Sequence, residues 1–172
     1  ESGDFGGLDS SVVVKADGLA AGKGVIVAKG RAAATEAINS LGAIAGSAAT
    51  DKIVLEECLV GREVSLLVFT DGESFALMPP VRDHKRIGDG DTGPNTGGMG
   101  TVSDDALLSE AELTDIAEHI IKPTLHACKR ENIRFSGILF FGIMMTANGP
   151  MVLEYNVRFG DPECEALVSL IK

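Results

Sequence analysis

The stretch VVVKADGLAAGKGVIVAKG, residues 12–30, decides the fold class of this chain. A run of β-branched residues enters a loop with three glycines and two lysines, and a second β-branched run leaves it. This pattern predicts two strands, residues 11–15 and 24–28, that pair as a hairpin. Glycine permits a close approach of the backbone, so the N–H groups of such a loop can fold over phosphates, and Lys15 can reach an α- or β-phosphate.

Two common phosphate-binding loops do not fit this stretch. The Walker A pattern needs four residues between its first glycine and Gly-Lys, but only three separate Gly18 from Gly22, and Gly24 follows Lys23 where Ser or Thr is required. The Rossmann pattern fails because Val27 stands in place of its third glycine. Both patterns also need a helix after the loop, whereas a strand follows here. The loop is therefore either a hairpin that covers phosphates or a plain glycine hairpin with solvated lysines.

The second informative stretch is VLEYNVRFGDPE, residues 152–163. Glu154 and Asn156 are two residues apart on a predicted strand, so their side chains point to the same face. A carboxylate and an amide oxygen suit Mg²⁺, which takes oxygen ligands together with phosphate oxygens. Arg158 has the same parity if the strand continues, and its charge can neutralise a developing phosphoryl charge. The alternative is an acidic residue paired with arginine at a solvated edge of the sheet.

The third stretch is HKRIGDGDTGPNTGGMG, residues 84–100, inside a long loop predicted for residues 79–100. Loops of this length within compact domains are usually functional or disordered. His84 is either a base or a structural residue. Four other residues offer amide, hydroxyl and backbone N–H groups to a phosphorylated or amino-acid substrate: Asn95, Thr96, Gly97 and Gly98.

The rest of the chain predicts an α+β fold with a mostly antiparallel sheet. Ser109 and Glu112 form a capping box that opens a long helix, which Pro123 should kink. Asp161 and Pro162 should be the cap and the first residue of a last helix. The other predicted elements are a helix at 32–45 and strands at 52–57, 63–70, 74–78, 137–146 and 151–156, the strand at 137–146 being central.

Composition excludes several classes of function. The chain has 172 residues, of which 45% are hydrophobic, and a formal net charge of −10. Such an acidic chain is not expected to bind nucleic acid or an anionic membrane surface, and it has no apolar run long enough to span a bilayer. The three cysteines are far apart and odd in number, which indicates reduced thiols and a cytoplasmic protein.

Five stretches resemble, in order, the ATP-grasp domain of the phosphoribosylamine–glycine ligase family, also called glycinamide ribonucleotide synthetase. They are VVVKADGLAAGKGV, LEECLVGREVS, MPPVRDHKR, GPNTGGMG and VLEYNVRFGDPE. The resemblance runs from residue 12 to the last residue. GPNTGGMG together with RFGDPE separates the chain from other ATP-grasp ligases, such as biotin carboxylase or D-alanine–D-alanine ligase. The resemblance implies an ATP-grasp fold, truncated at both ends.

The resemblance also implies an activity in de novo purine biosynthesis. ATP, glycine and 5-phosphoribosylamine would give glycinamide ribonucleotide, ADP and phosphate through a glycyl phosphate, with Mg²⁺ or Mn²⁺ as the metal. Two alternatives stay open. One is a non-catalytic nucleotide-binding module with the same fold, and the other is an ATP-grasp ligase for another carboxylate.

The resemblance assigns roles residue by residue. The phosphate cover would comprise Lys15, Gly18, Gly22, Lys23 and Gly24. Adenine would be bound by Glu56, Glu57 and Leu59, and the ribose hydroxyls by Glu63. The metal ligands would be Glu154 and Asn156, and the substrate side would include Asn95, Thr96, Gly97, Gly98, Met99 and Asp161. Arg158, Asp83 and Lys85 would lie at the reaction centre.

The family pattern divides the chain into three parts. Residues 1–11 would be a loose segment, residues 12–79 the flap subdomain, and residues 80–172 the catalytic subdomain, incomplete at its end. We expect the chain to be a fragment without the domains that precede and follow this region in the family, and without an upstream phosphate-binding lysine. The fragment would then turn over poorly or not at all. The parent protein would be either monofunctional or fused to other purine-pathway enzymes.

Overall fold

The computed structural model describes residues 10–18, 20, 24–90, 92–96 and 98–171. The chain forms two compact units, Glu1–Leu59 and Val60–Lys172. This division lies twenty residues before the functional boundary expected after residue 79. The physical reason is that the strand beginning at Gly61 pairs over its whole length with a strand near the end of the chain.

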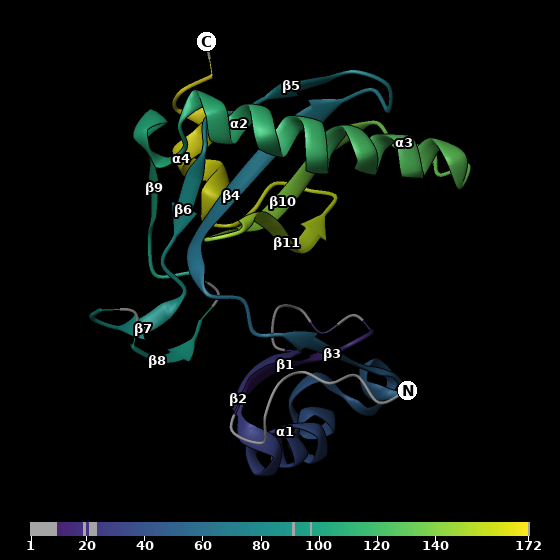
Figure 1. Cartoon of the computed structure of the whole chain (residues 1–172), viewed down its shortest axis with the longest axis vertical. Helices are drawn as coiled ribbons and strands as arrows, with labels where there is room; N and C mark the ends of the chain where they lie inside the picture. Colours follow the sequence, from purple (N-terminus) through teal and green to yellow (C-terminus); the bar gives the residue numbers. More distant parts are fainter. Residues whose placement is uncertain (1–9, 19, 21–23, 91, 97, 172) are drawn as a thin grey trace. The chain divides into compact units, whose positions relative to one another are not determined.

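The first unit is a three-stranded antiparallel sheet with one helix packed against it (Figure 1). Its central strand pairs from Ser11 opposite Lys29 to Lys15 opposite Val25, so the predicted hairpin is confirmed. A small core of valine, alanine and leucine side chains joins sheet and helix. The elements are β1 (Ser11–Ala16), β2 (Val25–Lys29), α1 (Gly30–Ala45), a 3-10 turn (Ser47–Thr50) and β3 (Ile53–Glu57).

The second unit is built on an antiparallel sheet with the strand order β11-β10-β4-β6-β9, and β5 also pairs with β4. β10 lies between β11 and β4, as expected of the central strand. β4 turns into β5 across Asp71-Gly72, and β10 turns into β11 across Asn148-Gly149. The strands are β4 (Gly61–Thr70), β5 (Phe75–Leu77), β6 (Val81–Asp83), β9 (Thr101–Ser103), β10 (Gly137–Thr146) and β11 (Gly149–Asn156).

Helices lie against both faces of this sheet (Figure 1). On one face, Leu66 and Phe141 pack against Ile116 and Ile121 of a long helical rod. On the other, Leu67 packs with Phe140 and Leu167. The rod comprises α2 (Glu110–Ile116), a π-helical turn (Ala117–Ile121) and α3 (Lys122–Arg130), and the opposite helix is α4 (Glu163–Val168).

The region predicted as one loop over residues 79–100 contains three short strands, so that prediction was wrong in part. β6 pairs with β4 and β9, while β7 (Arg86–Gly88) and β8 (Thr92–Asn95) form a separate two-stranded sheet. Strands of three or four residues are too short to give a periodic sequence signal. They owe their conformation to their pairing partners instead.

The two predictions about helix irregularity and capping have different outcomes. The rod has a π-helical turn that ends at Ile121, two residues before Pro123, where the sequence predicted a kink. A proline lacks the N–H of a regular turn, and the wider π turn accommodates this loss. Pro162, and not Asp161, is the residue at the N-cap of α4, and no side chain of the described residues caps that helix.

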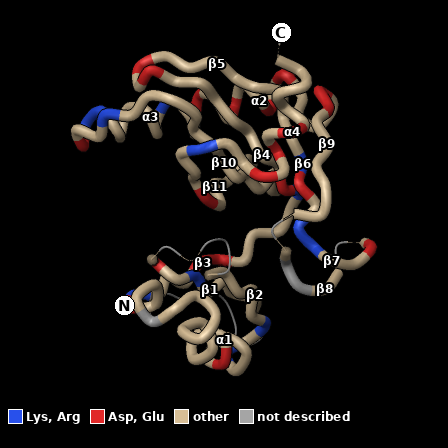
Figure 2. The backbone as a smooth tube through the Cα atoms, turned by 180° about the vertical axis from the view of Figure 1, so that it is seen from behind, with Lys and Arg blue, Asp and Glu red and all other residues tan. Residues whose placement is uncertain are grey.

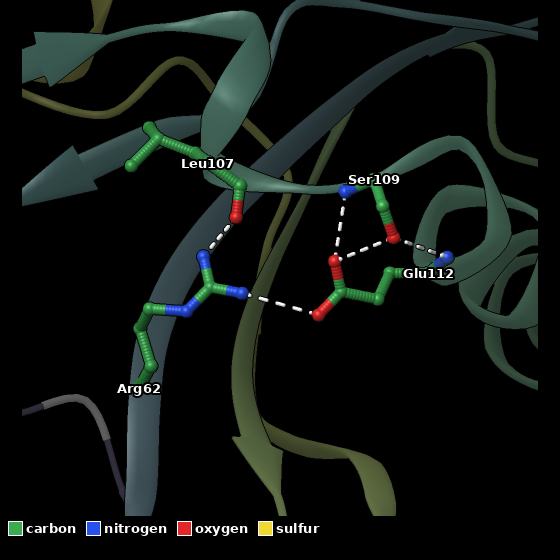
Figure 3. Close-up of polar contacts among 4 residues, drawn as sticks. All are labelled: Arg62, Leu107, Ser109 and Glu112. Carbon is green, nitrogen blue, oxygen red and sulfur yellow. Dashed lines mark hydrogen bonds and ion pairs between the residues drawn. The ribbon is translucent and has the colours of Figure 1, made fainter.

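The predicted capping box opens α2 and is tied to β4 by Arg62 (Figure 3). Ser109 N donates to Glu112 Oε2 (2.7 Å), and Glu112 N donates to Ser109 Oγ (3.3 Å). Arg62 Nη1 donates a hydrogen bond to Leu107 O, and Arg62 Nη2 donates one to Glu112 Oε1 (3.1 Å). Because Glu112 accepts bonds from Ser109 and lies beside Arg62, its pKa is lowered.

Three further features of the chain are its cysteines, the length of its apolar helices and the distribution of its charged residues. The cysteines Cys58, Cys128 and Cys164 are free thiols, as predicted. Among the described residues, no helix is long and apolar enough to cross a membrane. In the second unit, lysine and arginine occur in short stretches, among them the start of β7 and the end of α3, while acidic residues are spread over strands and helices (Figure 2).

Candidate active site

A row of polar side chains crosses the face of the second sheet that faces α4. On β4, Val64, Leu66 and Val68 point to the rod, so the alternation of side chains turns Glu63 and Ser65 to the opposite face. Gly142 on β10 pairs with Ser65 on one side and with Glu154 on the other. The register therefore aligns Ser65, Gly142 and Glu154 across three neighbouring strands.

The strand alternation predicted for Glu154 and Asn156 is present in β11. Asn156 Nδ2 donates to Glu154 Oε1 over 3.5 Å, so the two side chains lie on one face. Tyr155 points the other way, stacks edge-on against Phe141 with ring centroids 5.4 Å apart, and lies 3.2 Å from Thr124 Oγ1. The aromatic residue thus holds β11 against the rod, and the two polar residues face away from it.

Lys85 lies between two carboxylates of this face. Its Nζ is 2.7 Å from Glu63 Oε1 and 4.0 Å from Glu154 Oε1, and 31% of its side chain is exposed. Burial acts to lower the pKa of Lys85, but the negative charges of Glu63, Glu154 and Asp83 outweigh burial and raise that pKa. Lys85 is therefore a fixed positive charge at neutral pH.

Gly142 leaves the space that the Glu154 side chain occupies. A Cβ added at Gly142 would lie 3.0 Å from Glu154 Cγ, which is closer than side chains ordinarily pack. Gly142 was not among the residues predicted for the site. Its signal was a lone glycine inside an apolar strand, because such a glycine often marks a close approach of another group.

Residues of three sequence motifs, two of them expected at the substrate side, meet around Asp83. A Cβ added at Gly98 would lie 3.1 Å from Asp83 Oδ1 and 2.5 Å from Pro162 Cδ, and Gly98 has a φ of +141°, so glycine is required there. In the described part of the chain, Asp83 Oδ1 is buried without a hydrogen-bond partner. Burial, and next the charge of Glu163, raise the pKa of Asp83.

Glu163 and Ser65 are two further residues that the sequence analysis did not single out. Glu163 is only 4% exposed, and its Oε1 accepts a long hydrogen bond from Ser65 Oγ (3.5 Å). A Cβ at Gly160 would collide with the Glu163 carboxyl, so that carboxyl is packed beneath the loop before α4. The sequence signals were a single polar residue within the apolar run of β4 and an acidic residue at the start of a helix.

The loop after Lys85 holds that lysine by its backbone. Lys85 O accepts hydrogen bonds from Thr96 N (2.7 Å) and Thr96 Oγ1 (3.0 Å). Gly98 N in turn donates to Thr96 Oγ1 (3.1 Å), and Met99 N donates to His84 O (2.8 Å). The hydroxyl expected to hold substrate is therefore engaged within the protein. Gly97 and the side chain of Asn95 lie outside the described residues.

The remaining residues predicted for the site lie at the protein surface. β11 ends at Asn156, so the alternation that would put Arg158 beside the metal ligands does not extend to it. Arg158 Nη1 donates instead to Phe159 O (2.7 Å). Met99 and Asp161 are exposed. His84 was interpreted as either a base or a structural residue. Its Nδ1 lies 3.3 Å from Gly100 O.

In the first unit, Lys15 and Glu56 form an ion pair with 2.6 Å between Nζ and Oε2. Gly18 N donates to Ala49 O, and a Cβ at Gly18 would lie 2.6 Å from Ala49 Cα. Gly24 closes the hairpin, since its carbonyl accepts from Ala16 N (2.8 Å). The other residues predicted to bind nucleotide here are Glu57, which is exposed, Leu59, which is half-buried, and Gly22 and Lys23, which lie outside the described residues.

The donor set on β11 fits a hard divalent cation. Glu154 and Asn156 offer one carboxylate and one amide group side by side, and Mg²⁺ takes oxygen ligands of this kind. Among the described residues, no group of three or more His, Cys, Asp or Glu could hold a metal ion. Two protein ligands still suffice for Mg²⁺, because it usually keeps several waters and binds substrate phosphates.

Comparison with known proteins decides the family. A family model described as the phosphoribosylglycinamide synthetase ATP-grasp (A) domain matches residues 6–164. The chain belongs to this family. The resemblance seen in the five sequence stretches is confirmed, and so is the α+β ATP-grasp fold.

Relatives of the phosphoribosylglycinamide synthetase domain are similar over nearly all of this chain. A phosphoribosylamine–glycine ligase from Rhodopirellula baltica is 51% identical over 163 residues, and a trifunctional purine biosynthetic protein from Gallus gallus is 49% identical over 164 residues. Both alignments cover 94% of the chain, which spans 37% of the first protein and 16% of the second. The crystal structure of a phosphoribosylamine–glycine ligase from Thermotoga maritima is 37% identical, with a TM-score of 0.77, over 92% of this chain and 40% of that one.

Proposed function

We propose that this chain supplies the ATP-grasp part of an enzyme that ligates glycine to 5-phosphoribosylamine, forming glycinamide ribonucleotide, ADP and phosphate. One observation carries the proposal. In a domain of the phosphoribosylglycinamide synthetase family, Lys85 Nζ lies within 4.0 Å of carboxylate oxygens of both Glu63 and Glu154, and Asn156 lies beside Glu154. Phosphoryl transfer needs this combination of a fixed positive charge and oxygen ligands for a metal.

The family resemblance assigns nucleotide-binding residues in each unit. In the first unit, Lys15 and the glycine hairpin would contact the phosphates, and the segment Glu56–Leu59 would bind adenine. In the second, Glu63 would bind the ribose hydroxyls, while Glu154 and Asn156 would hold Mg²⁺ or Mn²⁺. The metal ion, when bound, supplies positive charge to the phosphate oxygens and the transferring phosphoryl group.

The reaction would proceed in two steps. A carboxylate oxygen of glycine attacks the γ-phosphorus, the bond from that phosphorus to the bridging oxygen breaks, and ADP leaves. The amine of 5-phosphoribosylamine then attacks the carbonyl carbon of the glycyl phosphate, phosphate leaves, and the nitrogen loses a proton. Lys85 and Arg158 would neutralise phosphoryl charge, and Asp83, Asp161 and residues 95–99 would position the substrates.

Two other functions are separated from this one by simple measurements. A non-catalytic module would bind Mg-ATP but release no ADP with any acceptor. A ligase for another carboxylate would release ADP with that acid and not with glycine. The names of the relatives support a role in purine biosynthesis, with or without fusion to other enzymes of the pathway, and a cytoplasmic location goes with that role.

Thermal unfolding with and without Mg-ATP tests the nucleotide site. Ligand at about 100 times its dissociation constant adds roughly 2.7 kcal/mol to the free energy of unfolding, a rise of roughly 5–10 °C in Tm for a chain of this size. The double variant Glu154→Ala, Asn156→Ala should lose the part of this rise that needs Mg²⁺. Glu118→Ala removes an exposed carboxylate on the rod and should keep the full rise.

A rise in Tm that persists in the double variant would show that these residues do not bind the metal. No rise at millimolar Mg-ATP, in a chain that unfolds cooperatively, would contradict nucleotide binding by this chain. Glycine-dependent release of ADP in the presence of 5-phosphoribosylamine would identify the acceptor.

A further inference from the structure

The ammonium group of Lys85 lies between the carboxylates of Glu63 and Glu154, where it supplies the positive charge that a bound cation would otherwise supply. Its ammonium group bonds Glu63 Oε1 at 2.7 Å and lies 4.0 Å from Glu154 Oε1. Two hydrogen bonds from Thr96 to Lys85 O fix the backbone at this residue. The position of the ammonium group therefore does not depend on the flexible side chain alone. The lysine is therefore built into this face of the sheet.

The charges around Lys85 exceed what one ammonium group can balance. Glu63, Glu154 and Asp83 all act on it, so three carboxyl groups surround a single ammonium group. Without Lys85, the carboxylates of Glu63 and Glu154 would lie near each other with no ammonium group between them, and such an arrangement attracts a divalent cation. With Lys85 in place, a cation that approaches Glu154 is repelled by the ammonium group, which lies 4.0 Å from Glu154 Oε1.

We infer that Lys85 is a built-in counter-cation that keeps divalent metal off Glu154 and Asn156 until nucleotide phosphates arrive with it. This rests on the proposed function, which assigns these two residues to the metal. The phosphates of a nucleotide bring negative charge, and this charge offsets the repulsion between Lys85 and the metal. The metal would accordingly bind as its nucleotide complex and not as the free ion.

Binding of Mn²⁺ without nucleotide tests this inference, with free Mn²⁺ measured by electron paramagnetic resonance. The wild-type chain should bind Mn²⁺ weakly. Lys85→Met should bind it roughly tenfold more tightly or better, because a unit charge a few ångströms from a divalent ion costs at least this much even in water-like surroundings. Lys85→Arg keeps the charge and should stay close to wild type.

Two further variants locate the effect. Lys85→Met combined with Glu154→Gln should lose the gain in Mn²⁺ affinity, because the ligand that the lysine shielded is gone. Lys122→Met removes an exposed lysine that pairs with Glu118 on the rod, and it should bind Mn²⁺ as wild type does. An equal gain in Lys122→Met would show a general effect of net charge and would overturn the inference.

A folded Lys85→Met chain with unchanged Mn²⁺ affinity would also overturn it. If Lys85→Met does not fold, Glu63→Gln decides, because Lys85 is then left with Glu154 as its nearest carboxylate. Mn²⁺ affinity should fall in Glu63→Gln, and a rise would contradict the inference. A wild-type chain that ignores Mg-ATP while Lys85→Met gains Mn²⁺ affinity would contradict the proposed function, and of the inference it would support only the exclusion of free metal by Lys85.

Discussion

The two faces of the β4–β10 sheet differ in what they contain, although the same strands build both. The face toward the α2–α3 rod is an uninterrupted apolar core that includes Val64, Leu66, Phe141 and Ile143. The opposite face has a smaller core near Leu67 and, beside it, a row of charged and polar side chains. One face supplies stability, and the other places carboxylates, an amide and a lysine together.

The difference shows how a single strand serves both purposes. Successive side chains of β4 alternate between faces, so Val64 and Leu66 belong to the core while Glu63 and Ser65 belong to the polar row. A shift of one residue in the pairing of β4 with β10 would exchange the two sets. Burial of the apolar set therefore fixes the geometry of the polar one.

Replacing Phe141 by alanine should give the largest loss of stability. The Phe141 side chain is completely buried and contacts the ring of Tyr155. Loss of its packing should lower the free energy of unfolding by about 3–5 kcal/mol, measured by urea denaturation. Phe69→Ala is the matched control, because Phe69 on β4 is 43% exposed and its loss should cost far less.

If the two faces have separate roles, Phe141→Ala should keep the rise in Tm that Mg-ATP causes. At temperatures where the variant is folded, Mg-ATP should still raise its Tm, because Phe141 points away from the polar row. A variant that loses only the response to Mg-ATP, with stability unchanged, would contradict the division of labour between the faces.

The larger elements of the fold were predictable from sequence because each has a periodic pattern or a strong local signal. The hairpin after Val12, the capping box at Ser109 and the central strand at Gly137–Thr146 all follow local rules. The short strands β6 to β9 were not predictable, because three or four residues carry no period and take their conformation from partners distant in sequence.

The candidate site shows the same limit. Alternation along one strand placed Glu154 beside Asn156, and the structure agrees. The alternation failed at Arg158 because β11 ends two residues earlier. The positions of Ser65 and Gly142 beside Glu154 depend on the register of three strands, and Glu163 joins them from a helix on the same face. No local pattern contains that information, although the family resemblance gave Lys85 and Asp83 a place near the reaction.

Replacing Asp83 by asparagine should raise stability at neutral pH, by at most about 1 kcal/mol because solvent screens this partly exposed carboxyl. Burial and the nearby charge of Glu163 raise the pKa of Asp83 above its ordinary value of 3.8, while Lys85 offsets part of the cost. Below the ordinary value, Asp83 is protonated in folded and unfolded chains, so the ionised form costs nothing. The cost grows as pH rises through 3.8 to the higher folded pKa, and it persists above that.

The gain from Asp83→Asn should therefore be present at pH 7 and absent near pH 3, as measured by urea denaturation at both values. A gain that is equal at both would point to packing and not to ionisation. If Asp83 serves the reaction, as proposed, the same variant should be more stable but less active.

The smallest effect on stability is expected for Gly142→Ala, one residue after Phe141 and on the opposite face. The added methyl group would lie 3.0 Å from Glu154 Cγ, so the Glu154 side chain must move by a few tenths of an ångström. Alanine also restricts the unfolded chain, which favours folding, so the two effects should leave the free energy of unfolding within about 0.5 kcal/mol of wild type. The rise in Tm caused by Mg-ATP should nevertheless shrink, because metal ligands need their positions held closely.

Gly42→Ala is the control for this substitution. Gly42 lies inside α1, where an added Cβ would be 3.5 Å from Thr50 Oγ1, an ordinary contact. That variant should gain roughly 0.5–1 kcal/mol from helix propensity and keep the full response to Mg-ATP. If Gly142→Ala also keeps the full response, the open space at Gly142 is not what places Glu154. The polar face would then accept an added side chain at a position where the strand register predicts a conflict. A reduced response at unchanged stability would show that one face can be altered without disturbing the other.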